Sequence, residues 1–298
     1  MATLIPGSST PEPLAGKLRS NQRQVLRQLL RSRTAVLGAI VAFIFLVMAI
    51  AGPSFVPYDP YKMSLGDRLQ EASTLHWFGT DEMGRDLFSR IVVGSRISLL
   101  VSFSGTLLAL LTGMVLGTVA GYYRGNLDAI IMRSMDVLLA FPGILLGIVV
   151  MAALGTSLTN LVIAVGIHSI PVFARLAYGS TLSTKECDYV LAARTIGAED
   201  LSILFRHILP NILSPLMVQA SLRVGSVILM TAGLGFLGLG VQPPLPEWGT
   251  MLSDARSYMR SEPHVSFYPG LMIFFAVLGF NLLGDGLRDA LDPRLRSA

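Results

Sequence analysis

The polar side chains best placed to do chemistry are those that interrupt long apolar runs of the sequence. Arg223 stands about ten residues into the apolar run 212–238, and Gln219 precedes it by one helical turn, so both can share one helix face. A guanidinium about 15 Å inside hydrocarbon is costly, which makes Arg223 a candidate functional residue. Arg223 could bind a carboxylate of a transported solute, or it could pair with an acid on a neighbouring subunit, and the sequence leaves both interpretations open.

Other polar positions also lie in apolar surroundings. His168 precedes Pro171, which is typical either of a kinked, pore-lining helix or of a buried core histidine. Asp136 lies near the start of the run 129–154, where a structural pair is the simpler interpretation, and Phe141–Pro142 indicates a kink in the same run. The candidate translocation path consists of Arg223, Gln219 and His168.

Residues for catalysis or metal binding show no recognisable spacing. The four histidines lack metal-ligand spacing, the single Cys187 allows no intramolecular disulfide, and no G-x-S-x-G or H-E-x-x-H motif occurs. The acidic pair considered for a membrane-embedded catalytic site, Asp128 and Asp136, lies about two helical turns apart. The sequence also lacks a G-x-x-x-x-G-K-[ST] phosphate loop, so it has no Walker-type site for ATP hydrolysis. We therefore predict no catalytic residue, no metal site and no cofactor bound by this chain.

The amino-acid composition indicates that much of the chain lies in a membrane rather than in water. Hydrophobic residues make up 52% and charged residues only 14%, against about 25% charged residues in soluble domains. The apolar runs lack the alternation of barrel strands, so we predict an all-α integral membrane protein. Six runs are long enough to cross about 30 Å of hydrocarbon as helices: 35–56, 97–121, 129–154, 159–178, 212–238 and 268–287.

The distribution of basic residues predicts the orientation of these six transmembrane helices. Lysine and arginine residues precede the first run and occur in the connections 122–133 and 179–211, whereas 155–158 carries none. By the positive-inside rule both termini are expected in the cytoplasm, so the net charge of +4 concerns topology rather than nucleic acid. The expected organisation is a cytoplasmic tail at 1–34, a transmembrane domain at 35–293 and a cytoplasmic end at 294–298.

The connection 179–211 is more organised than a linker needs to be. In "DYVLAARTIGAEDLSILFRHILP", residues 188–210, a helical pattern through Tyr189, Ala192 and Ala193 runs into Gly197, a residue type that accepts a left-handed backbone. A second helix is expected to begin at Glu199 and to stop at Pro210. Its apolar stripe at i, i+3, i+4 and i+7 consists of Leu201, Leu204, Phe205 and Ile208.

Physical chemistry alone gives this helix–turn–helix unit two interpretations. Its apolar stripe either lies on lipid or on the protein's own helices, or it forms a docking surface for a cytosolic partner. The segment "QPPLPEWGTMLSDARSYM", 242–259, has a similar ambiguity, because its apolar side fits either an interfacial helix anchored by Trp248 or a surface that receives a partner.

The stretch 188–210 resembles the cytoplasmic loop motif of permeases of binding-protein-dependent ABC importers. That motif reads Glu-Ala-Ala, three residues, Gly, nine residues, a hydrophobic residue, any residue, Leu-Pro. Leu191 replaces the glutamate and His207 takes the hydrophobic position. The segments "FGTDEMGRDLFSR", "FLGLGVQPPLPEWGTML" and "FNLLGDGLRDALDP" resemble the dipeptide, oligopeptide and nickel permeases of that group, including the dipeptide C-type and glutathione permeases. The matching positions of the loop motif are Ala192, Ala193, Gly197, Leu209 and Pro210.

The resemblance implies a type I ABC importer permease fold in the bacterial inner membrane. It implies a homologous second permease, two ATP-binding subunits that use ATP and Mg, and an external substrate-binding protein. The expected cargo is a di- or short oligopeptide, with glutathione or, less favoured, nickel as alternatives; a stand-alone secondary transporter or a membrane enzyme is a remote alternative. The loop residues that the resemblance assigns to ATPase docking are Tyr189, Ala192, Ala193, Gly197, Leu201, Leu204, Phe205, Leu209 and Pro210.

Overall fold

The computed structural model describes residues 29–30 and 32–291, and all regular elements of these residues are helical. The tail predicted for 1–34 and the end predicted for 294–298 lie largely or wholly outside the described residues. Among the described residues, five helices are long and apolar enough to cross a membrane. These spans are α2 with its following turn (Arg33–Ser54), α3 (Leu87–Tyr123), α6 (Leu158–Lys185), α9 with the segment before it (Asp200–Phe236) and α11 (His264–Leu291).

The run 129–154 is a bent pair of helices rather than one straight span. Helix α4 (Asn126–Ala140) and helix α5 (Gly143–Leu154) meet at 98°. Pro142 has no backbone N–H to donate, and it drives Phe141 into an extended conformation at ψ 132°. The kink expected at this position is therefore confirmed, and the predicted number of six spans holds when the pair is counted as one.

Small residues allow α3 and α6 to pack closely. On α3, Gly113 and Gly117 stand four residues apart, and the backbone of Ala174 on α6 lies against both of them. A Cβ at Gly113 would meet the nitrogen of Ala174 at 2.8 Å, so only glycine fits this approach. Close contact between small residues is a common way for helices to associate in lipid, where the hydrophobic effect does not drive them together.

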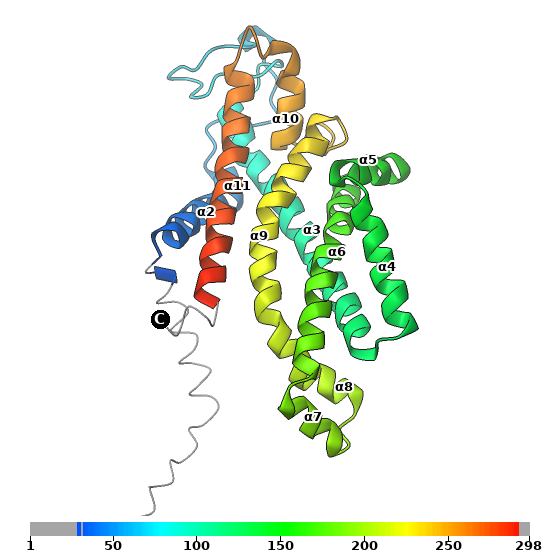
Figure 1. The fold of residues 1–298 in the computed structure, drawn as a ribbon. Coiled ribbons are helices and arrows are strands. Elements are labelled where there is room, and N and C mark those ends of the chain that lie inside the picture. Colours follow the sequence, from blue (N-terminus) through cyan, green and yellow to red (C-terminus); the bar gives the residue numbers. More distant parts are fainter. Residues whose placement is uncertain (1–28, 31, 292–298) are drawn as a thin grey trace, which may run out of the picture.

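Loops and a short helix cover one end of the long helices, which we call the cap end (Figure 1). The cap consists of residues 57–86 and helix α10 (Trp248–Asp254). The Trp248 side chain is fully buried and its Nε1 donates a hydrogen bond of 3.1 Å to the carbonyl of Ile91. The interfacial anchor considered for Trp248 is therefore wrong, because the indole fills the core between α3, α9 and α10 instead of reaching lipid.

Glu247 ties the cap to two long helices. It caps α10 by accepting hydrogen bonds of 2.9 Å from the amides of Gly249 and Thr250, and Ser98 of α3 donates a third of 3.3 Å. A Cβ at Gly235 of α9 would clash with its carboxylate. Burial raises the pKa of Glu247, although these hydrogen bonds oppose the shift.

The connection 179–211 lies at the other end of the molecule, which we call the loop end (Figure 1). Helix α7 (Asp188–Thr195) is followed by α8 (Asp200–Ile203), a π-helical turn (Leu204–Ile208) and α9 (Leu209–Phe236). The helix predicted to stop at Pro210 instead continues into the span. In the π-helical turn the N–H of Leu209 reaches back five residues to Leu204, and Pro210 then occupies the first turn of α9, where its missing N–H costs little.

Candidate functional site

Gly197 ends α7 in the way that the sequence predicts. Its φ is +81°, a left-handed conformation that L side chains disfavour, and its N–H donates to the carbonyl of Arg194 at 3.0 Å. The N–H of Ala198 reaches the carbonyl of Ala193 at 3.1 Å, which completes the helix cap. A Cβ at Gly197 would meet nothing within 4 Å, so the requirement for glycine is conformational and the space around the turn is open.

Tyr122 of α3 holds the loop in place. Its hydroxyl donates a hydrogen bond of 2.5 Å to the carboxylate of Asp200, and the guanidinium of Arg194 lies 5.5 Å from its ring centre. Lys185, at the end of α6, donates to the Tyr122 carbonyl at 3.1 Å. Sequence reasoning missed Tyr122, because it stands 78 residues before Asp200 and directly follows an apolar run. These contacts fix α7 and α8 on the ends of α3 and α6.

The predicted apolar stripe divides into a buried and an exposed set. Leu204 and Ile208 are buried against α3 and α6, whereas Leu201 and Phe205 are 62% and 68% exposed. Ala193 of α7, outside the stripe, is also buried in this cluster. Ile196, which the sequence analysis passed over, is 85% exposed beside Gly197. We call the exposed apolar set the loop surface: Tyr189, Leu191, Ile196, Leu201 and Phe205.

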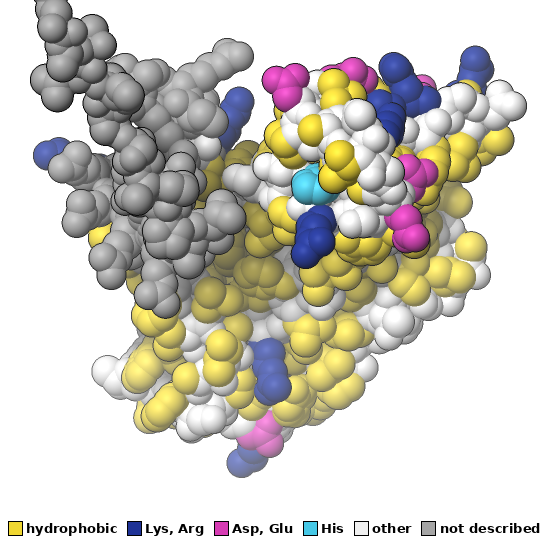
Figure 2. All heavy atoms as spheres, turned by 90° about the horizontal axis from the view of Figure 1, so that it is seen from below, with side chains coloured by type: hydrophobic (Ala, Val, Ile, Leu, Met, Phe, Trp, Pro, Cys, Tyr) yellow, Lys and Arg dark blue, Asp and Glu magenta, His cyan; other side chains and the backbone are white. Residues whose placement is uncertain are grey.

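The remaining predicted loop residues have mixed surroundings. Ala192 and Pro210 are exposed, and Leu209 is partly buried at the start of α9. Figure 2 looks onto the loop end and shows hydrophobic side chains interspersed among charged ones. An arrangement of this kind suits binding to another protein better than immersion in hydrocarbon.

Arg223 and Gln219 stand four residues apart within α9, so helical spacing gives them a common side. Arg223 lies midway along α9, is partly exposed, and donates through Nε to the hydroxyl of Ser169 on α6 at 3.1 Å. Gln219 lines a groove of about 600 Å³ between α6, α9 and α11. The polar residues in its lining are Asn211, Ser214, Gln219 and Arg288.

His168 is not brought into this groove. Its imidazole lies against Gly143 at the start of α5, where a Cβ on the glycine would meet Nε2 at 2.7 Å. Asp136 of α4 accepts a hydrogen bond of 2.5 Å from Arg175 of α6, so the structural pair expected for this acid is present, and the pair is about half exposed. Tyr178 and Asp128 join the same two helices at 3.0 Å. His168 therefore belongs to the contact of α6 with the bent pair.

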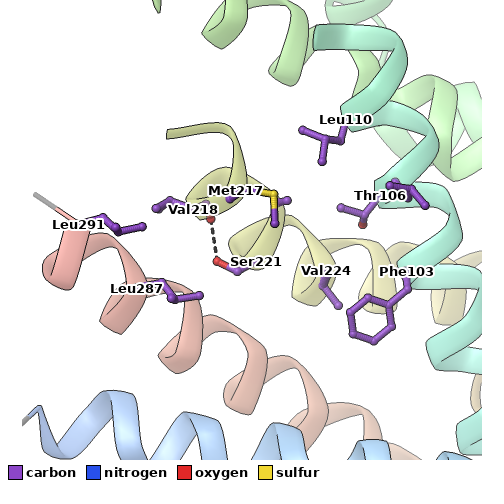
Figure 3. Close-up of a pocket in the computed structure, with 11 residues that line it drawn as sticks. Phe103, Thr106, Leu110, Met217, Val218, Ser221, Val224, Leu287 and Leu291 are labelled. Carbon is purple, nitrogen blue, oxygen red and sulfur yellow. Dashed lines mark hydrogen bonds between the residues drawn. The ribbon is translucent and has the colours of Figure 1, made fainter. Parts of the chain in front are cut away.

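A second cavity of about 360 Å³ lies between α3, α9 and α11 and is almost entirely apolar (Figure 3). Phe103, Leu110, Met217 and Leu287 are among its lining residues, and the hydroxyl of Ser221 is turned to the carbonyl of Val218. In residues 29–30 and 32–291, no group of three His, Cys, Asp or Glu side chains is placed to hold a metal ion.

Comparison with protein families identifies the family to which the chain belongs. Residues 113–297 match the model of the binding-protein-dependent transport system inner membrane component, and residues 20–72 match the N-terminal transmembrane domain of oligopeptide transport permease C. The chain belongs to this family of inner membrane transport components. The expectation of an ABC importer permease, rather than an enzyme, is thereby confirmed, and ATP hydrolysis belongs to a partner subunit.

Curated relatives of the permease match over nearly their whole length. The glutathione transport system permease protein GsiD of Pectobacterium atrosepticum is 50% identical over 281 residues, which cover 94% of this chain and 93% of the relative. The dipeptide transport system permease protein DppC of Alkalihalophilus pseudofirmus is 46% identical over 297 residues, covering 100% and 97%. Permeases named for dipeptides and for glutathione, two of the three cargo classes implied by the resemblance, therefore occur among its relatives.

Solved structures confirm the fold of the permease. An inward-facing MetNI methionine ABC transporter chain matches with a TM-score of 0.56 at 18% identity, covering 68% of this chain and 97% of that one. A chain of an amino acid ABC transporter with histidines matches with a TM-score of 0.52 at 14% identity, covering 66% and 92%. The type I importer permease fold predicted from the loop motif is the fold of this chain.

Proposed function

We propose that this permease imports short peptides and that the connection 179–211 is the loop on which an ATP-binding subunit docks. The observation that carries the proposal is the loop surface, whose apolar side chains are exposed around a rigid glycine turn. Exposed apolar residues on an anchored segment favour a protein partner, since burying them in an interface releases water. The docking residues are those of the loop surface together with Ala192, Gly197 and Pro210, while Ala193, Leu204 and Leu209 support them from beneath.

The helix path from the loop into the membrane supports a coupling role. Asp200–Phe236 forms one helical span, so a displacement of α8 by a docked subunit acts directly on α9 and on Arg223. ATP binding in the partner would then bias the permease between two states through differential contacts with this loop. Arg223 and Gln219 are proposed to lie on the translocation path, and His168 to border it at the bent pair.

The proposed assembly contains two homologous permease subunits, two ATP-binding subunits and an external binding protein. ATP and Mg act in the ATP-binding subunits, and this chain binds no cofactor. The loop end faces the cytoplasm, with both termini on that side, and the cap end faces the binding protein. This orientation is supported by the basic residues of 122–133 and 179–211.

Di- or short oligopeptides are the proposed cargo, and glutathione is the alternative. Both have support in named relatives, and glutathione is itself a short peptide with an additional carboxylate. Nickel is the less favoured alternative of the same family.

The test is the ATPase rate of the purified assembly in lipid with its binding protein, titrated with dipeptides and separately with glutathione. Stimulation by dipeptides supports the proposal. A response to glutathione alone keeps the mechanism and changes the cargo, whereas no response to either contradicts a peptide importer. The isolated permease should hydrolyse no ATP under the same conditions.

A further inference from the structure

Arg223 has an incomplete set of partners in the permease. A guanidinium carries five N–H donors, and among the described residues only Nε has an acceptor, the hydroxyl of Ser169. Within residues 29–30 and 32–291, no carboxylate lies within 4.0 Å of it. A charge at mid-depth of a membrane-spanning helix requires a counter-charge or water, so the outer nitrogens of this side chain are open to an anion or to water.

The groove between α6, α9 and α11 comes within one helical turn of this side chain along α9, at Gln219. Gln219 lines the groove and stands one turn before Arg223, and Leu176 lines it two turns from Ser169 along α6. On α9 and on α6, the residue that lines the groove therefore lies on the same face as the residue that makes the contact between Arg223 and Ser169. At the far end of the groove, Asn211 and Ser214 are exposed polar residues near the loop end.

We infer that Arg223 and Gln219 form a carboxylate subsite at the inner end of this groove, which takes the carboxylate of a peptide cargo. Ser169 is a positioning residue, because its hydrogen bond to Nε holds the guanidinium in one orientation and leaves the two outer nitrogens free to bind a ligand. Two parallel N–H donors match a carboxylate in bidentate geometry, and the amide of Gln219 can add a third donor. The inference rests on the proposed function for the cargo, but the placement of the charge is independent of it.

Thiol labelling in the assembled transporter tests whether the charge faces the groove. Gln219→Cys in a Cys187→Ser background is reacted with a small anionic and a small cationic methanethiosulfonate, and labelling of this chain is read by mass spectrometry. The ratio of anionic to cationic rates should be at least about fivefold higher with Arg223 than with Arg223→Gln, because an unpaired charge attracts one reagent and repels the other. An unchanged ratio would overturn the inference, since it means that an acid of the partner permease neutralises Arg223 or that Arg223 is turned away.

A control in the same groove makes the result specific. Asn211→Cys lies about 18 Å from Arg223 along the helix, beyond the screening length at physiological salt. Arg223→Gln should therefore change its rate ratio much less than that of Gln219→Cys. An equal change at both positions would contradict a local subsite.

The cargo is tested by labelling the unreacted Gln219→Cys variant in the presence of a free dipeptide or its C-terminal amide, both at about 10 mM and without binding protein. The free dipeptide should slow labelling of Cys at 219 at least about threefold more than the amide, and Arg223→Gln should abolish the difference. If the dipeptide and its amide protect equally, or neither protects, the site does not bind the cargo carboxylate. These readouts need no transport, so they stay interpretable even if the wild-type assembly imports neither dipeptides nor glutathione and the proposed function fails.

Uptake by the complete assembly then measures what the subsite does. Arg223→Gln should lower dipeptide uptake at least about tenfold with normal recovery of the partner subunits, and Arg223→Lys should lie between Arg223→Gln and the wild type, because it keeps the charge but loses the bidentate geometry. Uptake by Arg223→Gln within twofold of the wild type, or loss of the partner permease on purification, would overturn the role in cargo binding.

Discussion

Leu204 and Phe205 are neighbours in sequence with opposite surroundings. Leu204 is 7% exposed and packs beneath the loop, whereas Phe205 is 68% exposed on the loop surface. Leu204→Ala should destabilise the permease by about 2 to 5 kcal/mol, because it leaves a cavity. Phe205→Ala should leave its stability almost unchanged and weaken binding of the ATP-binding subunit, in line with loss of an exposed aromatic contact.

Heating followed by size-exclusion chromatography measures the first effect, and co-purification of the ATP-binding subunit measures the second. If Phe205→Ala bound its partner as tightly as the wild type, the loop surface would have to be assigned to lipid.

Tyr122 shows what sequence reasoning at this scale can and cannot find. The glycine turn at Gly197 was predictable because backbone conformation at a helix end depends on local residue type. The hydrogen bond of Tyr122 to Asp200 was not, since it depends on how α3 and α8 meet. The division of the stripe into buried and exposed residues was missed for the same reason, because a helical period does not tell which neighbours cover a face.

At the scale of elements, the contact between α3 and α6 gives two glycines opposite roles. A Cβ at Gly117 would collide with the backbone of Ala174, whereas a Cβ at Gly179 of α6 would meet nothing within 4 Å. Gly117→Ala should therefore lower the amount of folded permease recovered in detergent. Gly179→Ala should be neutral or raise stability by about 0.5 to 1 kcal/mol, because alanine favours a helix interior. Equal recovery of the two variants would contradict the close packing described for α3.

Glu247 predicts a pH dependence of the cap. Its pKa is raised by burial, so the folded state holds the proton more tightly than the unfolded chain does. The unfolded chain loses this proton around pH 4.5, whereas the folded protein keeps it to higher pH. The stability of the wild type relative to Glu247→Gln should therefore fall as pH rises above about 4.5. Melting temperatures of both proteins in nanodiscs between pH 4 and 8 measure this difference. A difference that grows with pH would mean that hydrogen bonding to the ionised carboxylate dominates.

The apolar runs predicted where the long helices lie, because hydrocarbon thickness sets their length. The Phe141–Pro142 pair likewise predicted the bend between α4 and α5. The continuity of α8 into α9 was missed, since Pro210 normally ends a helix and a π-helical turn that admits it has no clear sequence signal.

At the scale of the whole molecule, Cys187 reports on orientation. It is the single cysteine of the chain, lies at the start of α7, and is partly exposed. A membrane-impermeant thiol reagent should label it in inverted membrane vesicles and leave it unlabelled in spheroplasts. Thr74→Cys in a Cys187→Ser background, an exposed position in the cap, should show the reverse pattern. Labelling of Cys187 from the outside would place the loop end on the wrong side for an ATP-binding partner.

The central claim is that the loop around Gly197 couples ATP hydrolysis to movement of cargo. The most direct measurement is the number of peptides taken up per ATP hydrolysed in proteoliposomes, compared between the wild type, Gly197→Ala and Gly197→Glu. Both variants bear the same backbone penalty of about 1 to 2 kcal/mol, but only glutamate adds a charge to the loop surface. We predict that Gly197→Glu loses most uptake per ATP while Gly197→Ala keeps most of it. Full uptake per ATP in Gly197→Glu, at normal expression, would contradict the coupling role.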